Sequence, residues 1–372
     1  MLLCIFQLYP AALKKDKIGL FFGSPEQGII QTMRKTRNIT LILIIGTAAA
    51  GILGILLGNV PIPFRSLLQV IAAKLSGSSI PNELRGTERI LFLLRIPRTV
   101  MMLLTGAALA CSGAAYQGLF RNPLADPYLI GVSSGAGLGA VIALSISWSY
   151  SRLSAFMVPL FAFCFAIITV FVVFNLGRMG GYLNITGLLL AGVALNAFTS
   201  AMSSVWILVS GMELKRSFSW MLGGGGVAGW DRILVTAPLI LIGIAGQLRY
   251  AYPLNILQFG EDQAVQLGIP VRKVRIRLII YATLTTSAAI AVTGVIGFVG
   301  LIVPHLLRIL IGSDYRKLIP LSILGGAFLL TLSDILARIV LAPQEIPVGV
   351  VTAMTGAPFF LWILNRSNQA KV

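Results

Sequence analysis

Residues 94–127 read LRIPRTVMMLLTGAALACSGAAYQGLFRNPLADP, and this stretch decides the fold. Two arginines, Arg95 and Arg98, come just before an uncharged run of 22 residues from Thr99 to Phe120. A polar segment with two prolines, residues 121–127, follows the run. A helix of about 20 apolar residues is long enough to cross the hydrocarbon core of a bilayer. The stretch therefore predicts a membrane-spanning helix with charge at one end and a proline-rich exit at the other.

The composition of the whole chain agrees with a membrane protein. Of the 372 residues, 57% are hydrophobic and 11% are charged, whereas about a quarter of the residues of a soluble domain are charged. The net charge of +17 does not indicate a nucleic-acid partner. The basic residues lie between apolar runs instead of clustering with aromatic residues on one face. An excess of Lys and Arg in cytoplasmic loops explains the charge.

The chain contains ten apolar runs, and we therefore predict an all-α integral membrane protein with about ten transmembrane helices in one domain, residues 39–366. The runs are 39–58, 99–120, 128–148, 153–175, 185–209, 233–248, 278–293, 295–311, 318–340 and 348–364.

The number of spans and the nature of the N-terminal residues are not fixed by the apolar runs alone. Only Thr293 and Gly294 separate the seventh and eighth runs, and a single span there would reverse the orientation of everything after it. With ten spans and an N-terminus on the inside, more of the 29 lysines and arginines fall on the inner side, as the positive-inside rule requires. Residues 1–38 are predicted to be a tail that is either disordered or the product of a start site assigned too early.

The reactive side chains that an enzyme or an ion-driven pump would need are sparse. No lysine follows a glycine, so the chain has no phosphate-binding GxxxxGK[ST] loop and ATP would be hydrolysed by another subunit. His305 is the only histidine, which excludes a multi-histidine metal site, and we expect neither a metal nor a cofactor. Asp334 is the only acid within an apolar run, four residues before Arg338. Ion-coupled transporters usually carry more buried ionisable residues, so this alternative is disfavoured but open.

Several long motifs resemble one family of transport proteins. Besides residues 94–127 they are LLLAGVALN (188–196), GEDQAVQLG (260–268), GFVGLIVPHLLR (297–308), LSDILAR (332–338) and EIPVGVVTAMTGAPFFLWIL (345–364). Together they resemble the permease subunits of the type II ABC importers that carry iron siderophores, haem and cobalamin.

The resemblance implies a fold, partners and a cargo. It implies the type II importer permease fold, in the cytoplasmic (inner) membrane of a prokaryote. The implied partners are a second permease copy forming a homodimer, two ATPase subunits and an extracytoplasmic substrate-binding protein. The expected cargo is a ferric siderophore. Cobalamin and haem remain alternatives because the motifs are shared across these substrates.

The segment 254–277 is too polar to cross the membrane and is predicted to lie on the inner side. Acids at its start suit a helix N-terminus, and Gly268 with Pro270 suits a helix end. A short interfacial helix is one interpretation. The resemblance instead implies a coupling helix that contacts the ATPase, formed by Gly260, Glu261, Asp262, Leu267 and Gly268.

Two further groups of residues take roles from the resemblance. Arg95, Arg98 and Arg338 fall at outer ends of spans, and the resemblance implies that they dock the binding protein. Their alternative role is to anchor helix ends at the interface. Asn122, Leu124 and Thr186 fall at inner ends, and the resemblance implies a cytoplasmic gate. Loop capping by Asn122 and Pro123 is the alternative.

Overall fold

The computed structural model describes residues 25–148, 154–179, 182–183, 185–210, 214–225 and 229–369. The chain divides into two units, residues 1–45 and residues 46–372. In the first unit, the part of the predicted tail that lies within the described residues, 25–38, is helical. The second unit contains the end of the first apolar run and the nine other runs.

The described elements are helices, apart from one small hairpin in which β1 (Arg178–Met179) pairs antiparallel with β2 (Tyr182–Leu183). The helices of the first half are α2 (Pro25–Leu56), α3 (Phe64–Ser76), η1 (Asn82–Leu84), α4 (Arg85–Arg89), η2 (Ile90–Arg95), α5 (Ile96–Leu119), η3 (Pro127–Ile130), α6 (Val132–Ser145) and α7 (Ser154–Leu176). Those of the second half are α8 (Ile185–Val209), α9 (Leu214–Met221), α10 (Trp230–Arg249), α11 (Ala251–Leu257), α12 (Glu261–Gln266), α13 (Val271–Thr293), α14 (Val299–Ile311), α15 (Tyr315–Ile339) and α16 (Val348–Gln369).

Within the described residues, seven helical stretches are long and apolar enough to cross a membrane, and three shorter apolar helices accompany them. Each of the ten predicted runs coincides with one of these helices, so the all-α prediction with about ten spans is confirmed. The seventh and eighth runs are separate helices, α13 and α14. Gly294 (φ 81°) ends α13, and Phe298 (φ 69°) precedes α14. These left-handed residues reverse the chain direction where the apolar pattern alone was ambiguous.

Helix α5 forms the centre of this unit, and its small residues explain how. A side chain at Gly106 would collide with the carbonyl of Gly326 in α15, and one at Gly113 with the carbonyl of Gly300 in α14. Small residues allow such backbone approach in lipid, where no hydrophobic force drives helices together. The glycines of α5 therefore bring its backbone into contact with those of α14 and α15.

Two of the shorter helices, α6 and α14, begin inside the protein. Gly300, at the start of α14, adjoins both Pro127 and the carbonyl of Leu109, which lies in the middle of α5. The Tyr128 hydroxyl donates to the Ile296 carbonyl at 2.8 Å, joining the two segments that lead into these helices. Irregular backbone is tolerated at membrane depth where protein surrounds it. This burial explains why both helices are shorter than a full span.

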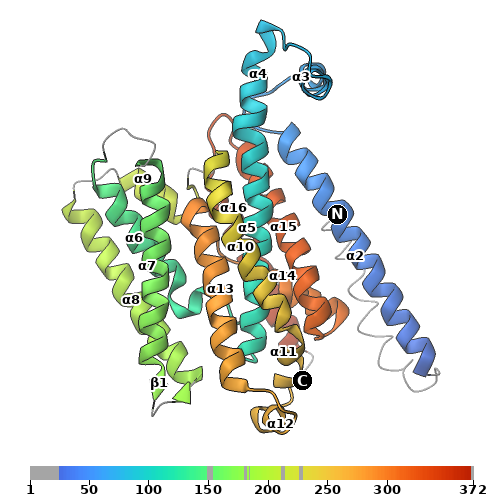
Figure 1. Cartoon of the computed structure of the whole chain (residues 1–372), viewed down its shortest axis with the longest axis vertical. Coiled ribbons are helices and arrows are strands. Elements are labelled where there is room, and N and C mark those ends of the chain that lie inside the picture. The colour runs from blue at the N-terminus through green and yellow to red at the C-terminus, as the bar shows by residue number, and fades with distance from the viewer. Residues whose placement is uncertain are drawn as a thin grey trace. The chain divides into compact units, whose positions relative to one another are not determined.

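One helical stretch is much longer than the bilayer is thick. Residues Asn82–Leu119 form a continuous helix of 38 residues, with a π-helical segment, η2, just before α5. A helix of that length measures about 55 Å, against about 30 Å for the hydrocarbon core. Its α4 end and the segment α12 lie at opposite ends of the unit (Figure 1). With the predicted orientation, the α4 end is outside and α12 is inside.

Candidate functional site

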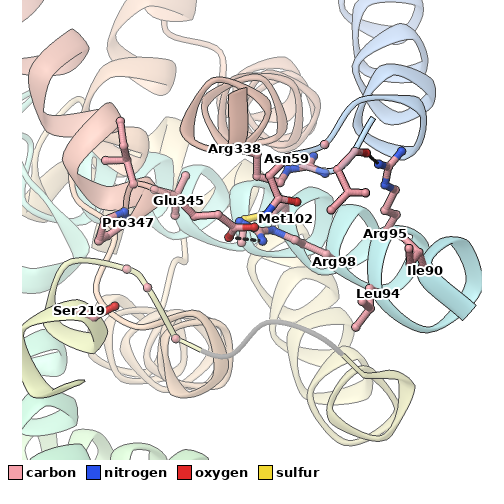
Figure 2. Close-up of a pocket in the computed structure, with 17 residues that line it drawn as sticks. Asn59, Ile90, Leu94, Arg95, Arg98, Met102, Ser219, Arg338, Glu345 and Pro347 are labelled. Atoms are coloured by element: carbon pink, nitrogen blue, oxygen red, sulfur yellow. Dashed lines mark hydrogen bonds and ion pairs between the residues drawn. The ribbon is translucent and has the colours of Figure 1, made fainter. Parts of the chain in front are cut away.

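An open cavity of about 500 Å³ lies at the outer end, where α5, α15 and the glycine-rich segment after α9 meet. Arg95, Arg98 and Arg338 all line it, together with Glu345 (Figure 2). Residues separated by more than two hundred positions in the sequence therefore come together at one site, and the three arginines that share one expected role are among them.

Arg95 and Arg338 are held by the end of α2. Arg95 donates to the Leu56 carbonyl at 2.7 Å and the Ile55 carbonyl at 3.3 Å. Arg338 donates to the carbonyls of Gly54 and Leu57, each at 3.0 Å. The last carbonyls of a helix have no partner within the helix and carry partial negative charge, so cations suit this position. Both arginines are buried, 6% and 2% exposed.

Arg98 belongs to an ion-pair cluster with two acids. Its guanidinium lies 2.9 Å from Asp334 and donates to Glu345 at 2.7 Å. Arg338 is also paired with Asp334, at 3.0 Å. Asp334 is fully buried, whereas about a fifth of the Arg98 side chain and over a third of the Glu345 side chain are exposed. The Arg98–Glu345 pair is therefore the accessible part of the cluster (Figure 2).

The three arginines are thus bound to groups of their own chain. Their bonds to helix-end carbonyls fit the alternative role, the anchoring of helix ends. The three guanidiniums and the two carboxylates together carry one net positive charge. The helical spacing of Asp334 and Arg338 revealed one pair in the sequence. The role of Glu345 was missed, because it lies beyond the end of α15 and only the tertiary fold brings it to Arg98.

The predicted coupling segment folds as α11, α12 and the first turns of α13. Gly260 (φ 128°) and Gly268 (φ 78°) bracket α12, in backbone conformations that favour glycine. Val265 and Leu267 expose 61% and 66% of their surface, so α12 presents apolar side chains outward. A short helix with such a face suits docking into a cleft of another protein.

Glu261 ties α12 to neighbouring elements. Its carboxylate forms an ion pair with Arg275 at the start of α13, and the Arg121 guanidinium lies 3.9 Å away. Arg121 has a left-handed backbone (φ 50°), uncommon outside glycine, and it immediately precedes the predicted gate residue Asn122. This contact could not be predicted from the sequence, because Arg121 and Glu261 lie 140 positions apart in different elements.

A second polar cluster holds α11 against the turn between α14 and α15. The Asn255 amide donates to the Asp314 carboxylate at 2.6 Å, and the Asn255 amide oxygen accepts from the Tyr315 backbone at 2.7 Å. Partial burial of the Asp314 carboxyl favours its neutral form, but hydrogen bonds from Asn255 and Arg316 outweigh this effect and lower its pKa.

The predicted gate residues lie at inner helix ends. The Asn122 side-chain oxygen accepts from the Leu124 backbone at 2.9 Å, which is the loop-capping contact considered as an alternative. Leu124 is 38% exposed, and Thr186 lies exposed at the start of α8. These contacts explain the local turn, and a gating role for the three residues stays a proposal.

A bundle of apolar helices, with a charged cavity at one end and an exposed helical segment at the other, defines a multi-pass membrane transport subunit. Comparison with known proteins specifies it further. The chain belongs to the FecCD transport family, whose profile matches residues 42–366. It is therefore the permease of an ABC importer, and not itself an enzyme.

Relatives within this family transport different cargoes. The hemin transport system permease HmuU of Yersinia pestis is 44% identical over 282 residues, which is 75% of this chain and 84% of the relative. The cobalamin import system permease BtuC of Halobacterium salinarum is 40% identical over 272 residues, 73% of this chain and 72% of the relative.

A solved structure shares the fold. It is an inward-facing conformation of a transporter assigned to the metal-chelate type. The similarity has a TM-score of 0.71 at 27% sequence identity, and covers 90% of this chain and 99% of that one. The type II permease fold expected from the motifs is confirmed. Family membership decides against an ion-coupled secondary transporter.

Proposed function

We propose that the chain is the permease of an ATP-driven importer that carries an iron chelate, a ferric siderophore, across the cytoplasmic membrane of a prokaryote. The match to the FecCD transport family along nearly the whole chain carries this proposal. A metal-chelate transporter of the same fold supports the chelate. Haem and cobalamin are the alternative cargoes, because relatives named for each are similarly close to this chain.

The same proposal assigns partners to the two ends of the molecule. Two ATPase subunits bind a homodimer of the chain on the inside, through Gly260, Glu261, Asp262, Leu267 and Gly268. An extracytoplasmic binding protein docks at the outer cavity. There Arg98 supplies the accessible positive charge, while Arg95 and Arg338 hold the cavity wall against α2.

Nucleotide-driven movement of α12 would reach the spans through Glu261. Its partners Arg275 and Arg121 belong to the start of α13 and the exit of α5 respectively. Asn122 and Leu124 follow Arg121 directly, so a displacement of α12 acts on residues next to the proposed gate. Thr186 is proposed to close the same gate from α8.

The experiment that tests the cargo is uptake into proteoliposomes containing the permease, its ATPase and its binding protein. We expect ATP-dependent accumulation of radioactive iron supplied as a ferric hydroxamate or ferric catecholate, and no accumulation of haem or cyanocobalamin. ATP-dependent uptake of haem or cyanocobalamin alone would replace the siderophore with that cargo. ATP-dependent uptake of none of them would reject the whole group of cargoes.

A further inference from the structure

Helix α3 is amphipathic and packs on the long outer helix with only one of its faces. Leu67 and Val70 are buried against Leu91 of η2. Lys74, in the last turn of α3, pairs with Glu88 of α4 at 2.9 Å and lies over the Phe92 ring at 5.4 Å. These contacts fix α3 to the stretch η1–α5 independently of any partner protein.

A second face of α3 is apolar but uncovered. Phe64, Leu68 and Leu75 expose 62%, 51% and 84% of their surface, and Ile71 is half-buried because it also packs against the cluster of Leu67, Val70 and Leu91. At about 100° per residue these four positions fall on one stripe next to the packed face. Arg65, Gln69 and Ser76 are also exposed and lie on a different side. An exposed stripe of this kind indicates an interaction surface.

The position of α3 along the long helix indicates what covers this stripe. Leu91, on which α3 packs, lies 28 residues before Leu119, the inner end of α5. That separation corresponds to about 40 Å along the helix. A bilayer including its headgroup layers is about 40–45 Å thick. With Leu119 near the inner boundary, α3 lies at the level of the outer headgroups.

The orientation and charge of this region fit the same level. In Figure 1 α3 is seen end-on beside α4, so its axis crosses the direction of α5, as an interfacial helix does. Arg65, Arg85 and Arg89 are exposed, and the ion pairs found among the described residues involve none of the three. Cations at this depth suit lipid phosphates.

We propose that α3 is an interfacial helix that lies in the outer headgroup layer of the bilayer and buries Phe64, Leu68 and Leu75 among lipid chains. It would fix the height of the long helix, and with it the height of the arginine-lined cavity, relative to the membrane surface. The proposal needs membrane insertion of the permease but does not depend on its cargo.

The test measures the surroundings of single spin labels on α3. Leu68→Cys and Leu75→Cys are compared with Gln69→Cys, a matched control on the polar side, in a background whose three native cysteines are replaced. The permease and its ATPase are reconstituted in vesicles of phosphatidylethanolamine and phosphatidylglycerol, and uptake by each variant is checked separately with the binding protein added. Collisions with oxygen, which concentrates in lipid, are compared with collisions with a water-soluble nickel chelate.

We expect labels at positions 68 and 75 to collide several-fold more with oxygen relative to nickel than the label at position 69. Equal nickel accessibility at positions 68 and 69 would overturn the proposal, because the stripe would then face water. Low accessibility to both reagents at position 68 would also overturn it, since protein would cover the stripe. If the label at position 68 becomes inaccessible only when the binding protein is added, the binding protein covers the stripe. If the label is inaccessible without the binding protein, a second copy of the permease covers the stripe.

Discussion

At the scale of single residues, Asp334 organises the outer cavity. It is fully buried and pairs with both Arg98 and Arg338. Arg338 and Arg95 in turn satisfy the last carbonyls of α2, where a cation meets the negative end of the helix dipole. Reversing the charge of all three arginines would place new carboxylates beside buried Asp334 and damage the fold, so such a variant would not report on docking.

The first prediction compares the two acids of this cluster. We expect Asp334→Asn to lower the stability of the permease by about 3–5 kcal/mol, because it leaves buried guanidiniums without their counter-charge. Glu345→Gln is the matched control, and it should cost only about 0–1 kcal/mol because its ion pair with Arg98 is partly exposed. Thermal unfolding in detergent measures both. If both variants lost the same stability, the burial of Asp334 would not explain how much it contributes to the stability of the permease.

The second prediction concerns Asp314 and pH. The pKa of its carboxyl is lower in the folded protein than the ordinary value of about 3.8. An acid with a depressed folded pKa stabilises the fold above its unfolded pKa, and this stabilisation is lost as pH falls through the folded pKa. We therefore expect Asp314→Asn to be less stable than the wild type at neutral pH and to show a smaller loss of stability below about pH 4. Unfolding temperatures measured from pH 7 to pH 3 test this; parallel curves for the two proteins would contradict it.

At the scale of elements, the sequence predicted the helices whose apolar runs are long enough to be recognised. All ten runs are helices, and the doubtful pair α13 and α14 is separate because left-handed residues break it at Gly294 and Phe298. Helices α3, α4 and α9 were not predicted. Outside the hydrocarbon core their sequences are mixed, and only tertiary contacts such as Leu67 on Leu91 stabilise them. The late start of α6 at Val132 and of α14 at Val299 could not be predicted either, since it depends on the packing of these segments inside the protein.

The third prediction tests the packing of α5 on α15. We expect Gly106→Ala to destabilise the protein by about 1–3 kcal/mol, because its methyl group would collide with the Gly326 carbonyl and force the helices apart. Gly137→Ala in α6 is the control, because a methyl group there has no neighbour within 4 Å. The control should be neutral or stabilise the helix by up to about 1 kcal/mol. Equal unfolding temperatures for Gly106→Ala and Gly137→Ala would contradict the prediction.

The fourth prediction concerns the link from α12 to α5 and α13. Glu261→Gln removes the ion pairs with Arg275 and Arg121, while Asp262→Asn changes an adjacent exposed acid for which no ion pair occurs among the described residues. We expect the Glu261 variant to assemble with the ATPase and hydrolyse ATP, but with several-fold less uptake per ATP hydrolysed. Asp262 is proposed to contact the ATPase, so Asp262→Asn is expected to weaken ATPase binding at most, and the assembled complex should keep the wild-type ratio of uptake to hydrolysis. Uptake and hydrolysis measured in the same vesicles give this ratio. If the ratio were unchanged in Glu261→Gln, Glu261 would have no role in coupling ATP hydrolysis to uptake.

At the scale of the whole molecule, the bundle of apolar helices and the class of transporter could be predicted from the sequence, because composition, run length and long motifs determine them. The convergence of the three arginines could be expected as well. It could not be predicted that these arginines are already paired within the chain, because Glu345 and the carbonyls of α2 reach them only in the folded protein. The cargo is not determined at this scale either, since hemin and cobalamin permeases resemble the chain to a similar degree.

The last prediction tests the outer cavity as a docking site with one charge. Arg98→Gln removes the accessible guanidinium, while Arg338 still pairs with Asp334. Charges at the edge of an interface mainly change the association rate and its dependence on salt. We therefore expect the binding protein to associate several-fold more slowly with this variant at low salt, and the difference from the wild type to shrink as salt rises. Arg65→Gln on α3 removes the same charge away from the cavity and should leave the rate nearly unchanged. Stopped-flow association of a labelled binding protein with the permease–ATPase complex, checked first for equal thermal stability, measures both variants. If the two substitutions slow association equally, only net charge attracts the binding protein, and the three arginines serve to anchor helix ends.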